Sequence, residues 1–222
     1  MLKVDHLSIG YDGRDLVRDI SFELVPGECV LLAGPNGTGK TTLLRALVAE
    51  GVVLIPTNIP KVKGFTVEAF VRTGCYRESD WRGRISKEVE GRMEEALKML
   101  GIEGLKGRDI STLSDGEFQK ACLATGLTRR AEVLLLDEPT AHLDVENRID
   151  VLRTLREVAR KTGTAVLFSS HDLHDALQVA DRVFVLTRDG RFLASASVIS
   201  SEVEKSKADV LQAAFATLSD LR

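Results

Sequence analysis

Residues 34–41 constrain the fold of this chain more than any other segment. They read Gly-Pro-Asn-Gly-Thr-Gly-Lys-Thr and match the full pattern of a phosphate-binding loop. The apolar run Cys29–Ala33 precedes the loop, and a helix is predicted from about residue 40 to 49. A glycine loop between a strand and a helix places backbone N–H groups around an anion, so a chance glycine cluster is the weaker interpretation.

The residues of this loop have expected roles toward a nucleotide. The glycines let backbone N–H groups surround the β-phosphate, Lys40 is predicted to reach the β- and γ-phosphate oxygens, and the Thr41 hydroxyl to bind Mg²⁺. The predicted nucleotide-binding residues of this segment are Gly34, Pro35, Asn36, Gly37, Thr38, Gly39, Lys40, Thr41 and Thr42.

Two adjacent carboxylates, Asp137 and Glu138, follow a second buried run, Val133–Leu136. Open α/β sheets bind ligands at the carboxyl ends of their strands. Asp137 is therefore predicted to hold Mg²⁺, through a water molecule, and Glu138 to act as general base for an attacking water. Acidic residues at the end of a strand often have no function and simply lie in solvent. In a chain that also has a phosphate-binding loop, they indicate nucleotide hydrolysis.

A capping box opens the helix that is predicted to run toward Arg129. Ser114 is followed three residues later by Glu117, the spacing of a reciprocal helix cap. A capped helix start is also a ready anion site, because its free N–H groups point outward.

The order of these motifs resembles that of the ABC ATPase family, from Tyr11 to about Gly190. Residues 113–117, Leu-Ser-Asp-Gly-Glu, are similar to the LSGGQ signature of that family, and Glu138 lies in an Asp-Glu-Pro-Thr run. Tyr11 stands where the family carries the aromatic residue that stacks on adenine. Residues 141–144 resemble the D-loop at the dimer interface, and His171 matches the switch histidine that contacts the γ-phosphate.

The resemblance implies an α/β fold of the P-loop NTPase, ABC ATPase type. A mostly parallel sheet would carry an N-terminal antiparallel β part, here shortened, and an inserted α-helical subdomain. Residues 1–56 and 129–195 would form the nucleotide-binding core, residues 57–128 the helical subdomain with the signature, and residues 196–222 a C-terminal helical tail.

The resemblance also implies hydrolysis of ATP to ADP and phosphate with Mg²⁺, coupled to transport. The catalytic residues would be Glu138, His171 and Lys40. Two copies would pair head to tail, so that one copy completes the nucleotide site of the other with Ser114, Asp115, Gly116, Glu117 and Asp144. Integral-membrane permease subunits would be the other partners, placing the chain in the cytoplasm on the inner face of the cell membrane.

Other details of the sequence bear on the type of transporter and on rival functions. Residues 66–68, 74–76 and 171–176 look most like the ATPases of iron-siderophore, haem and cobalamin importers. The net charge of -3 and the pI of about 5.9 argue against nucleic acid as a partner. A nucleotide-sensing ABC module with little hydrolysis and a non-transport ABC ATPase are the alternatives.

Two departures from the family pattern stand out. The glutamine that normally touches the metal and the attacking water is absent, and Thr57 or Asn58 is expected to substitute for it. Only 17 positions separate Lys40 from Thr57, so part of the β subdomain is expected to be missing. Asp115 adds a negative charge to the signature, which Lys120 or Mg²⁺ would have to compensate.

Overall fold

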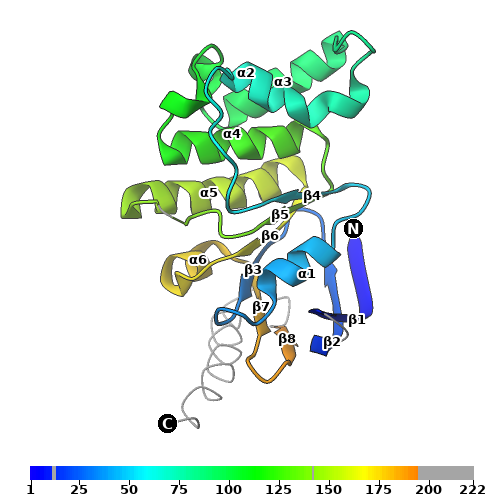
Figure 1. Ribbon diagram of the computed structural model, residues 1–222. Helices are drawn as coiled ribbons and strands as arrows, with labels where there is room; N and C mark the ends of the chain where they lie inside the picture. Colours follow the sequence, from blue (N-terminus) through cyan, green and yellow to red (C-terminus); the bar gives the residue numbers. More distant parts are fainter. Residues whose placement is uncertain (12–13, 142, 195–222) are drawn as a thin grey trace.

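The computed structural model describes residues 1–11, 14–141 and 143–194 (Figure 1). The predicted C-terminal tail, residues 196–222, and His142 of the predicted D-loop lie outside these described residues.

Apolar runs form the central sheet. Its strands, in chain order, are β3 Cys29–Ala33, β4 Val52–Ile55, β5 Val133–Leu136, β6 Ala165–Ser169, β7 Arg182–Leu186 and β8 Phe192–Ala194. They lie in the order β4-β5-β6-β3-β7-β8, and every neighbouring pair from β4 to β7 is parallel. Helices cover both faces of such a sheet, so its strands are apolar throughout instead of alternating. The parallel order also brings the ends of β3, β5 and β6 to the same edge.

The last strand was not predicted from the sequence. The turn at residues 189–190 returns the chain to β8, which pairs antiparallel with β7.

A second, two-stranded antiparallel sheet lies at the N-terminus. It consists of β1 Leu2–Tyr11 and β2 Arg14–Leu24. Their inward side chains, such as Val17 and Ile20, pack with α1 (Lys40–Ala46) against one face of the central sheet. Five residues connect α1 to β4, too few for additional strands there.

The helix α1 ends earlier than the expected residue 49. Leu47 is its C-cap, and the chain then turns so that the N–H of Val52 donates to the Ala49 carbonyl. The turn is needed because β4 already begins at Val52.

The opposite face of the sheet carries the remaining helices. These are α2 Val67–Arg72, α3 Lys87–Met99, α4 Asp115–Thr128, α5 Val145–Thr162 and α6 Leu173–Val179, with 3-10 helices at Thr73–Glu78, Glu103–Leu105 and Ile110–Thr112. Figure 1 shows α2, α3 and α4 gathered at one end of the molecule, beyond α5. No helix of the described ranges is long and apolar enough to cross a bilayer.

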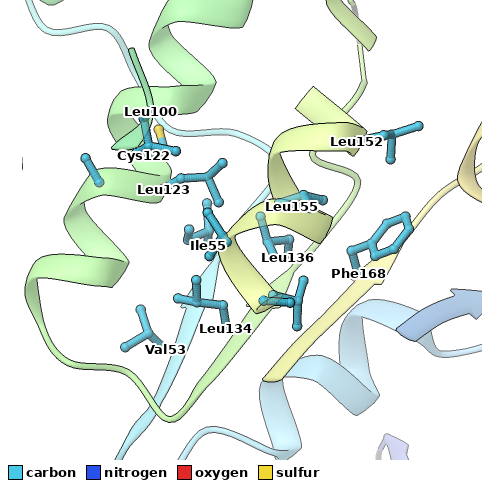
Figure 2. Close-up of a cluster of buried hydrophobic side chains, with 14 of the residues drawn as sticks. Val53, Ile55, Leu100, Cys122, Leu123, Leu134, Leu136, Leu152, Leu155 and Phe168 are labelled. Atoms are coloured by element: carbon cyan, nitrogen blue, oxygen red, sulfur yellow. The ribbon is translucent and has the colours of Figure 1, made fainter. Parts of the chain in front are cut away.

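The helix α4 packs tightly on the edge of the sheet. Figure 2 shows Cys122 and Leu123 of α4 facing Ile55, Leu134 and Leu136. A Cβ atom at Gly126 would lie only 2.5 Å from Leu134 Cδ2, so a glycine there permits the close approach. This contact fixes α4 relative to β5, the strand that Asp137 follows.

Candidate functional site

The glycine loop connects β3 to α1, as predicted. Gly34 has a φ of 146°, and a Cβ atom there would lie 2.5 Å from the carbonyl oxygen of Leu186 on β7. Only glycine accommodates both constraints. Asn36 and Gly37 are exposed at the turn of the loop, whereas Thr38 is buried and donates to the Pro35 carbonyl over 2.9 Å.

Lys40 lies inside this loop. Its Nζ donates to the carbonyl oxygens of Gly34 over 2.8 Å and of Pro35 over 3.1 Å. Burial lowers the pKa of the Lys40 ammonium below its ordinary value of 10.5, and the charges of Glu138 and Asp137 pull it back upward. A buried cation held by two backbone carbonyls suits an anionic ligand that lies in the same loop.

The oxygen atoms expected to bind Mg²⁺ lie together. Thr41 Oγ1 donates to Asp137 Oδ2 over 2.8 Å, and Ser169 Oγ donates to Asp137 Oδ1 over 2.9 Å. Asp137 is buried and forms no ion pair within the described part of the chain. A buried carboxylate beside a threonine hydroxyl is the hard-oxygen donor set that Mg²⁺ prefers, so these residues fit the ion.

Ser169 is a site residue that sequence reasoning missed. Besides bonding Asp137, its Oγ accepts the backbone N–H of Glu138 over 2.9 Å. Its position at the end of β6, next to an acidic strand end in a parallel sheet, is the only signal that could have found it.

Glu138 and His171 face each other. His171 Nε2 lies 2.5 Å from Glu138 Oε1, and Glu138 has a φ of 50°, which is unusual for a residue with a side chain. The side chains of Glu138 and His171 are 24% and 47% exposed, so solvent water can reach the carboxylate. A carboxylate held by a histidine beside the phosphate loop can accept a proton from an attacking water.

Thr57 also reaches this cluster. Its hydroxyl donates to the backbone carbonyl of Asp137 over 2.8 Å. Asn58 lies next to it on the wall of a cleft of about 400 Å³ between residues 56–61 and α4.

Tyr11 lies beside the loop, at the end of β1. Its hydroxyl contacts that of Thr42, and the residue is 58% exposed. The ring is therefore available for stacking with a planar base.

The signature forms the capping box that the sequence predicts. Ser114 Oγ accepts the N–H of Glu117 over 3.2 Å, and Glu117 Oε2 accepts the N–H of Ser114 over 2.8 Å. The backbone N–H of Ser114 is the main cause that lowers the pKa of Glu117 below 4.5. Ser114 itself is exposed, at the tip of α4.

The prediction that Lys120 compensates the charge of Asp115 is wrong. Lys120 instead pairs with Asp150 over 2.6 Å. The partner of Asp115 is Lys61, whose Nζ lies 2.6 Å from Asp115 Oδ1. The sequence could not reveal this pair, because 54 positions separate the two residues.

The predicted dimer residue Asp144 caps α5. It accepts the N–H of Asn147 over 2.8 Å, and the side chain of Asn147 lies against Gly116. The start of α5 therefore supports the tip of α4.

The structure divides the predicted residues into two groups, one at the carboxyl ends of the central strands and one at the tip of α4. Lys40, Asp137, Glu138 and His171 surround the glycine loop. In the described ranges no hydrogen bond or ion pair joins Ser114 to residues 34–41. Figure 1 shows α1 and α4 on opposite sides of the sheet.

Comparison with known proteins agrees with this geometry. The ABC transporter family matches residues 17–141. The petrobactin import ATP-binding protein FpuC of Bacillus anthracis is 30% identical over 213 residues, covering 85% of this chain and 78% of FpuC. The zinc import ATP-binding protein ZnuC of Roseobacter denitrificans is 35% identical over 202 residues, covering 84% of this chain and 75% of ZnuC.

The fold is shared with solved structures. A nucleotide-free ATP-binding cassette from an ABC transporter superposes with a TM-score of 0.79 at 18% identity, covering 95% of this chain and 94% of that one. The chain therefore belongs to the ABC transporter family, as a subunit that binds ATP with Mg²⁺ and hydrolyses it to drive transport.

Proposed function

We propose that this chain works as a head-to-tail pair that encloses two ATP molecules and powers an importer of a metal or metal chelate. The observation that carries the proposal is the separation of the two groups of site residues. The capped tip of α4 presents Ser114 and Asp115 to solvent, and within the described residues neither contacts the loop of its own copy. A second copy, related by a two-fold axis, would bring that tip to the loop.

Within each site, one copy would bind most of the nucleotide. The Tyr11 ring stacks on the adenine, and the N–H groups of residues 34–42 and Lys40 bind the phosphates. Thr41 and Asp137 would hold Mg²⁺, and the ion would supply positive charge to offset the charge that develops on the phosphate oxygens. The partner copy adds Ser114 and Gly116, with Asp115 and Glu117 beside them.

Hydrolysis would then depend on the paired Glu138 and His171. Glu138 accepts a proton from a water molecule while the oxygen of that water attacks the γ-phosphorus. The bond between the γ-phosphorus and the bridging oxygen of the β-phosphate breaks, which releases ADP and phosphate. His171 Nε2 lies 2.5 Å from Glu138 Oε1, so it orients the carboxylate and would face the γ-phosphate of a bound nucleotide. Thr57, or Asn58 beside it, takes the place of the missing glutamine and contacts the attacking water.

The direction of transport and its substrate class are inferred from the relatives. FpuC is named for petrobactin import and ZnuC for zinc import. A relative from Streptomyces avermitilis, SsuB 1, 36% identical over 190 residues, is named for aliphatic sulfonates import. All three names share import, and that of ZnuC names a metal as the cargo. Import at the inner face of the cell membrane, with a permease that selects the cargo, accounts for this pattern.

The pairing is tested with Glu138→Gln, which keeps the size of the side chain but removes the base. With saturating ATP and Mg²⁺, light scattering should give about twice the chain mass of 24.3 kDa, whereas ADP should leave single chains. The matched control is Glu157→Gln on the surface of α5, which should hydrolyse ATP like the original chain. A Glu138→Gln protein that stays single at saturating ATP contradicts the proposal.

Phosphate release by the original chain separates hydrolysis from nucleotide sensing. Steady Mg²⁺-dependent release that Glu138→Gln abolishes supports the proposal, and binding without release favours the sensor. Co-purification from membranes, followed by identification of the bound subunit, tests the permease partner.

A further inference from the structure

Lys61 holds the tip of α4, although it lies outside every nucleotide-binding motif. Its Nζ donates to Asp115 Oδ1 over 2.6 Å and to the carbonyl oxygen of Leu113 over 2.9 Å. The same ammonium lies 5.3 Å from the centre of the Phe118 ring. The Lys61 side chain is only 26% exposed, so its position is well defined by these contacts.

The segment that carries Lys61 begins at the catalytic cluster. The Thr57 hydroxyl donates to the carbonyl of Asp137, and Lys61 lies four residues further along. Both residues line the 400 Å³ cleft between this segment and α4. The segment therefore links the Mg²⁺-binding strand end directly to the tip of α4.

The charge of Asp115 makes this link important for nucleotide binding. Asp115 is the first residue of α4, and its side chain is 63% exposed. A carboxylate at a helix N-terminus is favourable for the helix, but it competes with an incoming anion for the same positive end. An uncompensated Asp115 would also repel a triphosphate that approaches the exposed Ser114.

Other cations near the tip are less suited to compensate Asp115. Lys120 pairs with Asp150 over 2.6 Å, and Arg108 lies 3.7 Å from Glu117. Lys61 is the cation that contacts Asp115 within the described residues.

We propose that Lys61 is a positioning residue for the signature: it neutralises Asp115 and fixes the tip of α4, so that the tip can receive the triphosphate bound by a second copy. This proposal rests on the head-to-tail pair proposed above. Lys61 touches neither the nucleotide nor the reacting atoms, and acts through Asp115 and Leu113.

The test measures the ATP concentration for half-maximal pairing of the Glu138→Gln protein at low salt. Lys61→Met, which keeps most of the apolar length of the side chain and removes its charge, should raise this concentration about two- to fivefold, because one exposed charge pair is involved. Adding Asp115→Asn to Lys61→Met should restore it, since the repelling charge is gone. High salt should shrink the effect of Lys61→Met, because exposed charges are screened.

Two further variants control for loss of structure. Lys63→Met removes the same charge from an exposed position on the same segment and should leave the half-maximal concentration unchanged. Lys61→Arg keeps the charge and should pair nearly as the parent does. Thermal unfolding of every variant shows whether it is folded.

The outcomes separate this proposal from the proposed function. If the Glu138→Gln parent does not pair at all, the head-to-tail function fails. If the parent pairs and folded Lys61→Met needs no more ATP than Lys63→Met, the role of Lys61 is overturned. It is equally overturned if Asp115→Asn fails to restore pairing, because a purely structural tether to Leu113 would behave in that way.

Discussion

Ser169 Oγ donates to Asp137 Oδ1 over 2.9 Å, and this serine oxygen also accepts the backbone N–H of Glu138. Ser169 is fully buried at the end of β6, and the two carboxylates follow the adjacent strand β5. One hydroxyl therefore sets the positions of both the Mg²⁺-binding carboxylate and the proposed general base.

Replacing Ser169 with alanine should lower ATPase activity. The change leaves the N–H of Glu138 and one oxygen of Asp137 without their buried partner, which should cost about 1–3 kcal/mol of unfolding free energy. Outer-shell partners of a metal site typically change metal affinity or activity about 10- to 100-fold. We expect a loss of that size in kcat, with a higher Mg²⁺ requirement, measured by phosphate release across a Mg²⁺ titration.

Thr164→Ala is the matched control. Thr164 is also buried, precedes the same strand, and donates to the Ala131 carbonyl over 3.1 Å at the opposite edge of the sheet. It should lose stability without changing the Mg²⁺ dependence. Equal kinetic losses in both variants would show that Ser169 acts only through general stability.

Thr57→Val should slow hydrolysis about tenfold while ATP binding persists. Valine keeps the shape of threonine but removes the hydroxyl that donates to Asp137 and that could contact the attacking water. Single-turnover hydrolysis and equilibrium nucleotide binding check the two parts separately. Asn58→Ala, made alongside, shows which of the two residues replaces the missing glutamine. If a variant that carries both Thr57→Ala and Asn58→Ala hydrolyses ATP at the original rate, neither residue has that role.

Glu117→Gln should change the pH dependence of stability. The lowered pKa of Glu117 means that its carboxylate stabilises the folded chain above pH 4.5 and that this contribution disappears as the pH falls through the lowered pKa. Glutamine can keep the cap but not the charge, so the variant should be less stable at pH 7 by about 0.5 kcal/mol. Urea unfolding of both proteins should show this difference shrinking as the pH falls below 4.5. A difference that is the same at pH 7 and in acid would contradict this assignment.

The sequence predicts the central sheet closely. The apolar runs Cys29–Ala33 and Val133–Leu136 have the observed bounds of β3 and β5, because each is a short buried strand between polar or glycine-rich segments. In contrast, β8 has only three residues and exists because β7 offers it an edge. A strand defined by its neighbour leaves little pattern of its own in the sequence.

The sequence predicts those residues of the site that belong to a local sequence motif. The loop, Asp137, Glu138 and the cap at Ser114 each have a local pattern with a physical reason. The contacts Ser169–Asp137 and Lys61–Asp115 join residues 32 and 54 positions apart. The first depends on the pairing of β5 with β6, and the second on how residues 56–61 lie against α4. Tertiary packing selected Lys61 over the expected Lys120, which lies on α4 itself but faces Asp150 of α5.

The central claim is that each ATP site is built from two copies, and mixing two inactive variants tests it most directly. Lys40→Ala disables the loop and Ser114→Arg disables the tip, so each variant alone should release phosphate only at background rate. In an equal mixture, half of the pairs combine one intact loop with one intact tip, and activity should recover to about one quarter of the original rate. A mixture no more active than the two variants measured apart, with both folded, would contradict the claim.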